Sequence, residues 1–234
     1  MTTRPSSAVV IDRDQVWQVI GAERLRVAEL LSGLVASDWD QPSLCAGWTV
    51  RDVAAHLTLQ QLGVRAAAGM MLAYRGDTDR AIGDRARQRA RAWPTTTIIA
   101  EIRGTAGSRR HNFGVTYQET LIDVLVHAQD IAIPLGRSHP MPPLAAAAAA
   151  TRIWTMRWPP PFPARRAMEQ FRVTATDVAW SAGHGPPVSA PISSIVLLSA
   201  GRLAALPHVS GDGAVQLTAT LTSQAGKIAR TSTP

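Results

Sequence analysis

Residues 45–57 read CAGWTVRDVAAHL and predict a helix that carries one histidine, His56. Thr49 is a typical N-cap residue, and Asp52 stands three positions later, which is the spacing of a capping box. An apolar stripe follows at helical spacing, formed by Val50, Val53, Leu57 and Val64. The pattern predicts a helix from residue 50 to about Tyr74 that buries one face. The role of His56 therefore depends on which residues this helix packs against.

A second segment, residues 121–131, reads LIDVLVHAQDI and repeats the pattern Asp-Val-x-x-His. Its apolar residues predict a helix over residues 116–133. One face of this helix carries the polar residues Glu119, Asp123, His127 and Asp130. Carboxylates on one stripe repel each other unless positive charge lies opposite them. We therefore expect a metal ion or an arginine against this face.

The two histidines and Asp123 form a candidate metal site. In helical bundles, metal sites are built from side chains that project inward from facing helices. A set of His56, Asp123 and His127 would offer two nitrogen ligands and one oxygen ligand. Three protein ligands leave positions open for water or substrate, which is typical of catalytic sites. From the spacing alone, an ordinary histidine–aspartate ion pair remains the alternative.

Three acidic residues and the single cysteine need separate interpretations. Asp52, Glu119 and Asp130 are candidates for supporting the ligands or for binding the metal themselves. For Asp52 we favour capping with a supporting role, because the capping box already explains its position.

Cys45 precedes a helix N-terminus, where a thiolate can be stabilised, but no histidine is close to it in sequence. Packing under the start of the helix is its favoured role, with catalysis as the alternative. One cysteine also excludes an intramolecular disulfide framework and an all-cysteine zinc site.

The flanking segments extend the helical part of the chain. Residues 12–36 and 142–158 read as helices, and residues 75–115 read as a polar, irregular stretch with one or two short helices. The Pro-rich run WPPPFPARR at residues 158–166 suits neither a helix interior nor a central strand. This run is the best candidate for a domain boundary.

The sequence after the Pro-rich run changes character. It shows strand patterns at residues 171–180 and 214–222 and a helical pattern at residues 190–206. We therefore predict an α+β protein with three parts: a helical bundle at residues 1–158, a Pro-rich linker at residues 159–170 and a small α+β domain at residues 171–234.

Composition limits the classes of function. The chain has 234 residues, 46% of them hydrophobic, so it can bury a core. No apolar run approaches the roughly 18 residues of a membrane-spanning helix, and the N-terminus lacks the apolar centre of a signal peptide. We therefore expect a cytoplasmic protein without a membrane partner.

The net charge is +7, and the arginines between Arg75 and Arg110 could attract nucleic acid. No known nucleic-acid motif surrounds them, so a solvated surface is the favoured interpretation.

The two histidine segments also carry a family resemblance. PSLCAGWTVRDVAAHL at residues 42–57, followed by HAQDIAIPLG at residues 127–136, resembles the mycothiol-dependent maleylpyruvate isomerase family of actinobacteria. That family belongs to the DinB-like superfamily of metal-binding helical bundles. Residues 178–217 are similar to the second domain of the family, so the resemblance covers roughly residues 15–220. It implies a DinB-like four-helix bundle followed by a small α+β C-terminal domain.

The resemblance also implies a site and its cofactors. The family takes one histidine from the helix after Gly-Trp-Thr and a carboxylate–histidine pair from a later helix. These ligands match His56, Asp123 and His127, although the family pattern has glutamate where this chain has the shorter Asp123. The implied cofactors are a divalent metal, with zinc as the expected ion, and the low-molecular-weight thiol mycothiol. Arg202, in the second domain, is the candidate for binding substrate.

The resemblance thus implies a metal-dependent enzyme that uses mycothiol for thiol transfer or for isomerisation of a small electrophilic substrate. A metal would favour the thiolate form of the thiol at neutral pH. The expected partners are small molecules, namely the thiol and the electrophile. Because Asp123 departs from the family pattern, one alternative stays open: a catalytically inactive member that binds a ligand or a partner protein.

Overall fold

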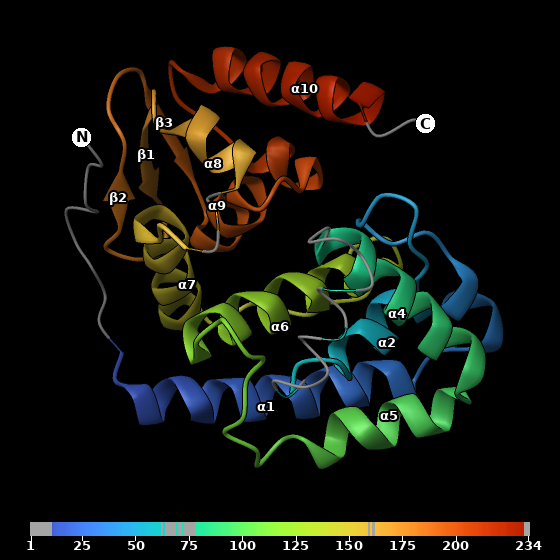
Figure 1. Ribbon diagram of the computed structural model, residues 1–234. Coiled ribbons are helices and arrows are strands. Elements are labelled where there is room, and N and C mark those ends of the chain that lie inside the picture. The colour runs from blue at the N-terminus through green and yellow to red at the C-terminus, as the bar shows by residue number, and fades with distance from the viewer. Residues whose placement is uncertain are drawn as a thin grey trace. The chain divides into compact units, whose positions relative to one another are not determined.

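The computed structural model describes residues 11–61, 78–158, 160 and 162–231, together with positions 63, 69 and 72. The chain divides into two compact units, one spanning Asp12–Pro140 and the other containing residues 141–234 (Figure 1). The first unit is helical over its described residues, and the second combines helices with a small sheet. The predicted α+β class is therefore confirmed.

Among the described residues of the first unit, helices make up the regular structure. They are α1 (Arg13–Ser32), the 3-10 helix η1 (Ala36–Asp40), α2 (Val50–Leu57), α4 (Thr78–Ala92), α5 (Thr95–Gly104) and α6 (Tyr117–Ala132). α1 packs against α5 and α6, and α2 packs against α4, α5 and α6 (Figure 1). The helix of the first Asp-Val-x-x-His copy therefore lies against the helix of the second.

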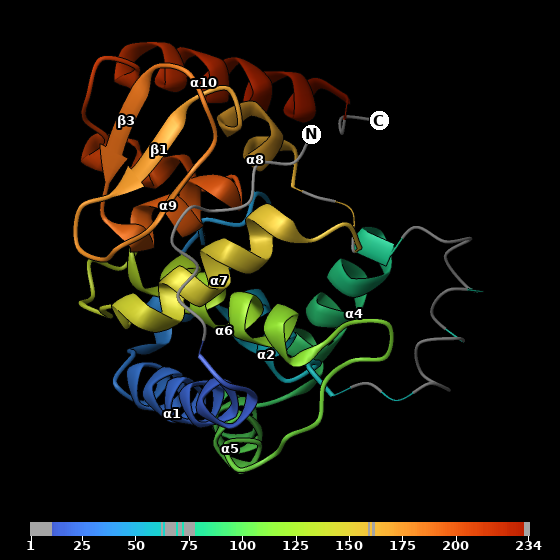
Figure 2. The same ribbon diagram turned by 90° about the vertical axis from the view of Figure 1, so that its left-hand side faces the viewer.

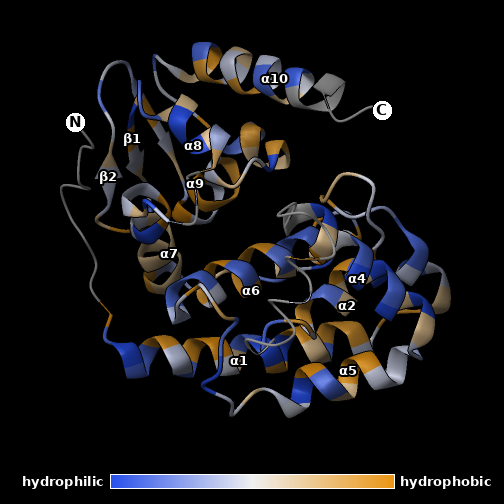
Figure 3. Cartoon of the chain, viewed as in Figure 1, coloured by the Kyte–Doolittle hydropathy of each residue, from blue (hydrophilic) through white to orange (hydrophobic). Residues whose placement is uncertain are grey.

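The core of this unit determines which face of α2 turns inward. Val53 and Leu57, which belong to the predicted apolar stripe, are both buried and share a hydrophobic cluster with Ile131 of α6. Fully burying a side chain of this size contributes about 1.5–3 kcal/mol. α6 is hydrophobic along much of its length, with hydrophilic residues interrupting it (Figure 3). Apolar packing thus brings the polar residues of the two helices to one place.

Gly21 allows a close approach between α1 and the chain that follows α5. A Cβ atom at this position would lie 2.5 Å from the carbonyl oxygen of Ala106. Any other residue would therefore displace the segment 105–108. Two carbonyl oxygens of that segment accept hydrogen bonds from Arg24, which is three residues further along α1.

A three-stranded sheet of order β2-β1-β3 lies in the second unit. β1 (Arg172–Ala175) pairs antiparallel with β2 (Ser181–Ala182) and parallel with β3 (Pro187–Ala190). The helices of this unit are α7 (Pro143–Thr155), α8 (Pro163–Met168), α9 (Ile192–Ser199), the 3-10 helix η2 (Leu203–His208) and α10 (Ala214–Thr231). α9 packs against α7, α8 and β1, and α10 packs against α8 and β3 (Figure 2).

Two predicted elements of the second unit are wrong in type or length. Residues 214–222, predicted as a strand, begin α10, because Leu217 and Leu221 are buried at the i, i+4 spacing of a helix face. The helix predicted at residues 190–206 ends at Ser199, since Gly201 takes a positive φ of 84° that terminates it.

The predicted helix from residue 50 to about Tyr74 also ends early. α2 stops at Leu57, and residues 58–61 form a turn in which the N–H of Leu59 donates to the carbonyl oxygen of His56. Val64 and Tyr74, the later part of the prediction, lie outside the described residues. In the described part of the chain, no helix combines the length and apolar character needed to cross a membrane.

The compact units divide at a different place from the predicted linker at residues 159–170. The division lies between Pro140 and Met141, so α7 falls in the second unit, where it packs against α9. Pro163 of the Pro-rich run occupies the first turn of α8. A missing N–H costs nothing at that position, so this proline marks the start of a helix within the unit.

Candidate metal centre

The N-terminus of α2 fixes the direction in which His56 points. The hydroxyl oxygen of Thr49 accepts from the N–H of Asp52, and Oδ2 of Asp52 accepts from the N–H of Thr49 at 2.9 Å. The predicted capping box is therefore present, and it occupies the Asp52 carboxylate. His56 follows two turns later on a helix whose first residue is set by this cap.

Alanine in place of Thr49 is expected to lower the free energy of unfolding by about 1 kcal/mol, because the N–H of Asp52 loses its acceptor. Thermal unfolding measures the effect as a lower Tm. The matched control is Thr96→Ala, since Thr96 is exposed on α5. An equal Tm in the Thr49 variant and the wild type would contradict the cap's contribution.

Three predicted residues converge between α2 and α6. Nε2 of His56 lies 3.2 Å from Oδ1 of Asp123, and Nε2 of His127 lies 3.3 Å from the same oxygen. The two imidazole rings meet edge to face with centroids 4.7 Å apart. The side chains of His56 and His127 are 12% and 14% exposed, and that of Asp123 is 30% exposed. The cluster is thus largely dry, and a small ligand can reach it at the carboxylate.

A second group of residues lies behind His127. Asp130, whose side chain is fully buried, accepts a hydrogen bond from Nδ1 of His127 at 2.8 Å and one from Sγ of Cys45 at 3.1 Å. An ionised carboxylate can only accept, so the proton of a neutral His127 sits on Nδ1 and leaves Nε2 free to bind a metal. This is the geometry expected of a supporting residue.

Cys45 makes two kinds of contact, and the sequence predicted only the first of them. It packs against the hydrophobic core beneath α2, as its favoured role predicts. It also lies 3.7 Å from Nδ1 of His127, a residue 82 positions away that no local pattern could connect with it. Cys45, His127 and Asp130 therefore form a second group whose ligand atoms lie close enough to hold a metal ion.

Gln60 and Arg24 also belong to the site, although sequence reasoning missed both. Nε2 of Gln60 donates to Oδ2 of Asp123 at 2.6 Å, and Oε1 of Gln60 accepts from Nε and Nη2 of Arg24. Gln60 lies beyond the end of α2 at Leu57, so no helix face shared with His56 marked it in the sequence. Trp48 completes the surroundings, with its ring edge-on to that of His56 at 5.6 Å.

The pKa values of Asp123 and His127 shift in opposite directions. Burial alone would raise the pKa of Asp123, but the charges and hydrogen bonds of His56 and His127 hold that pKa well below its ordinary value. Burial alone would lower the pKa of His127, but Asp123, with help from Asp130 and Cys45, raises that pKa well above its ordinary value. An ionised carboxylate therefore lies beside an imidazole that holds its proton tightly, and a metal that bound at this nitrogen would have to displace that proton.

The donor set fits a divalent metal of the zinc type. A tetrahedral ion with bonds of about 2.0–2.1 Å separates its nitrogen and oxygen ligands by about 3.3 Å. The separations of 3.2 and 3.3 Å between Oδ1 of Asp123 and the two Nε2 atoms match that value. The shorter aspartate therefore reaches far enough. The same distances also suit charged hydrogen bonds, which is the ion-pair alternative.

Glu119 and Arg202, the other predicted site residues, make contacts outside the cluster of His56, Asp123 and His127. Oε2 of Glu119 accepts from the N–H and the hydroxyl of Thr116, at 2.7 and 2.6 Å, so this carboxylate caps α6 one turn before Asp123. Arg202 belongs to the second unit, where its Nη1 donates to the carbonyl oxygen of Ala200 at 2.7 Å. A substrate contact for Arg202 stays a prediction.

Arg89, which belongs to the predicted basic cluster, makes its contacts within the first unit. Nη1 of Arg89 donates to the carbonyl and hydroxyl oxygens of Thr58, and its guanidinium stacks on Trp93 at 4.3 Å. Burial, and then the neighbouring Arg85, lower the pKa of Arg89. Arg75 lies outside the described residues. Arg89 is therefore partly buried and held by contacts within the first unit, which differs from the solvated surface that the sequence favoured.

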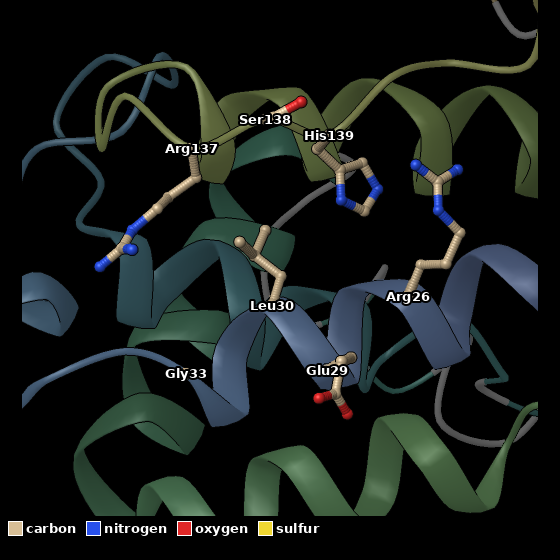
Figure 4. A pocket seen from close by; sticks show the side chains of 7 residues that line it. All are labelled: Arg26, Glu29, Leu30, Gly33, Arg137, Ser138 and His139. Carbon is tan, nitrogen blue, oxygen red and sulfur yellow. The ribbon is translucent and has the colours of Figure 1, made fainter.

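A cavity of about 410 Å³ opens elsewhere in the first unit, between α1 and the segment 137–139. It is lined by Arg26, Glu29, Leu30, Gly33, Arg137, Ser138 and His139 (Figure 4). Nη1 of Arg26 lies 2.7 Å from Glu23, and Nη2 of Arg137 lies 3.6 Å from Asp38. Acids of the same unit thus balance both arginines, and none of the predicted metal ligands lines this cavity.

Part of the chain matches a known family model, and its fold is similar to a solved structure. Residues 20–116 match the family model of the mycothiol maleylpyruvate isomerase N-terminal domain, a range that includes α2. The fold is similar to the crystal structure of the mycothiol-dependent maleylpyruvate isomerase, with a TM-score of 0.54 and 16% sequence identity over 82% of this chain and 90% of that one. No curated protein matches the chain significantly. The sequence match and the shared fold together confirm the predicted resemblance to the mycothiol-dependent maleylpyruvate isomerase family.

Proposed function

We propose that this protein is a divalent-metal-dependent enzyme that uses mycothiol to isomerise a small electrophilic substrate or to transfer the thiol to it. The observation that carries the proposal is the convergence of His56, Asp123 and His127, whose ligand atoms all lie within 4.8 Å of one another. The matched N-terminal domain family and the fold shared with a mycothiol-dependent isomerase support mycothiol as the thiol. Two nitrogens and one carboxylate form a ligand set that zinc takes in catalytic sites, and we propose zinc as the metal.

In this proposal, the protein's residues bind and orient. His56, Asp123 and His127 hold the ion, and Asp130 keeps His127 in the tautomer whose Nε2 is free to bind it. A bound divalent ion would supply a Lewis acid that favours the thiolate form of a thiol at neutral pH. The thiolate is the form of a thiol that reacts with electrophilic carbon. Trp48 packs on one edge of His56 and limits the access of water from that side.

The test is an assay of the zinc-loaded protein with mycothiol and maleylpyruvate, and with mycothiol and a panel of other electrophiles. Loss of substrate absorbance reports isomerisation, and loss of free thiol reports transfer. We expect turnover that requires both zinc and mycothiol and that disappears in His56→Ala. The control is His208→Ala, because His208 is an exposed residue of η2.

Two outcomes would reject parts of the proposal. A protein that binds zinc stoichiometrically but turns over none of the substrates would favour the alternative of an inactive, ligand-binding member. A protein that binds no zinc would reject the metal centre itself.

A further inference from the structure

The carboxylate of Asp123 is held from both sides. Its Oδ1 atom faces the Nε2 atoms of His56 and His127, at 3.2 and 3.3 Å. Its Oδ2 atom accepts a hydrogen bond from Nε2 of Gln60 at 2.6 Å. Gln60 is buried, with 4% of its surface exposed. The two oxygens of one carboxylate therefore have different partners.

The chemistry of its neighbours fixes the orientation of the Gln60 amide. The guanidinium of Arg24 can only donate, and its Nε and Nη2 lie 3.2 and 3.1 Å from Oε1 of Gln60. Ionised Asp123 can only accept. Turning the amide over would place donor against donor and acceptor against acceptor. Nε2 of Gln60 must therefore point at Oδ2 of Asp123.

Arg24 is itself immobilised. It is 2% exposed, and its Nη1 donates to the carbonyl oxygens of Thr105 and Ser108 at 2.9 and 3.1 Å. Those oxygens lie in the segment that approaches α1 at Gly21. A line of hydrogen bonds thus runs from α1 through Gln60 to the carboxylate on α6, and each member has one allowed orientation.

We propose that Gln60, held by Arg24, is a positioning residue that keeps Asp123 a monodentate ligand and so selects a four-coordinate metal. The inference rests on the proposed metal centre. While Oδ2 is bound to Gln60, Asp123 offers only Oδ1 to an ion. A free Oδ2 would permit bidentate binding, which raises the coordination number and suits larger, oxygen-preferring ions such as Mn²⁺.

The test replaces Gln60 with methionine, which has a similar length and flexibility but cannot donate to a carboxylate. The matched control is Gln61→Met at the adjacent position, where Oε1 of Gln61 accepts from the hydroxyl of Ser108. Zinc affinity is measured by competition with a chelator. The visible absorption of the cobalt-loaded protein reports coordination number, because its bands weaken as coordination rises from four to six.

We expect Gln60→Met to lower zinc affinity about 10–100-fold, the usual cost of an outer-shell change, and to weaken the cobalt bands. Gln61→Met should change neither. Gln60→Glu is a second variant, since it keeps an acceptor for Arg24 and replaces the donor to Asp123 with a negatively charged acceptor, which cannot hold Oδ2. It should also alter the cobalt spectrum, and it covers the case in which Gln60→Met fails to fold.

A wild-type cobalt spectrum and zinc affinity in either folded Gln60 variant would overturn the inference. An equal loss of affinity in Gln61→Met would overturn it too, because the effect would then be general loosening of the turn. A wild-type protein without stoichiometric metal would instead overturn the proposed metal centre, and this inference with it.

Discussion

Replacing His127 with alanine is expected to abolish stoichiometric zinc binding. The change removes one of the three donors that converge on a single point, and it also deprives buried Asp130 of a hydrogen-bond donor. The loss in affinity should exceed the roughly 10–100-fold that outer-shell changes cost. Metal analysis after dialysis, together with chelator competition, measures the effect.

The control for this variant is again His208→Ala, which leaves the first unit unchanged and should retain one zinc per chain. Comparing the thermal unfolding of the metal-free proteins separates loss of the site from loss of the fold. If folded His127→Ala kept one zinc per chain at wild-type affinity, the proposed ligand set would be wrong.

Zinc affinity is expected to fall steeply as the pH is lowered through neutrality. The pKa of His127 is raised, so below that pKa zinc must displace a proton in order to bind. Each displaced proton costs about tenfold in affinity per pH unit. Affinities measured at about pH 8, 7 and 6 give the slope. A slope of zero across this range would contradict a protonated His127 in the metal-free cluster.

Asp123→Asn tests the origin of this pH dependence. The charge of Asp123 raises the pKa of His127, so its removal should return that pKa toward its ordinary value, which NMR titration of the metal-free variant measures. In the metal-free protein, the Asp123–His127 pair stabilises the fold between the two folded-state pKa values. That stabilisation is lost when the pH rises through the raised pKa of His127 or falls through the lowered pKa of Asp123.

Local sequence patterns predicted the parts of the site that depend on one helix. Thr49 and Asp52 form the expected cap, and Asp123 and His127 share the expected face of α6. The convergence of these residues with His56 follows from apolar stripes on both helices, which the spacing also indicated. Periodicity therefore predicted the helix faces on which His56, Asp123 and His127 lie, although α2 has only eight residues.

Other parts of the structure depend on contacts that the sequence does not mark. Arg24 and Gln60 are 36 positions apart, and each would be unremarkable on a solvated helix. Cys45 meets His127 only because a loop folds against α6. At residues 214–222, apolar and polar residues alternate as in a strand, but burial of Leu217 and Leu221 on one side stabilises a helix.

X-ray absorption at the zinc edge of the zinc-loaded protein tests the central claim most directly. The structure offers two alternative ligand groups that share His127, one with Asp123 and His56 and one with Asp130 and Cys45. Our account predicts a first shell of nitrogen and oxygen only, at about 2.0–2.2 Å, with the scattering signature of two imidazoles. A sulfur ligand at about 2.3 Å would place the metal at Cys45 and contradict the account.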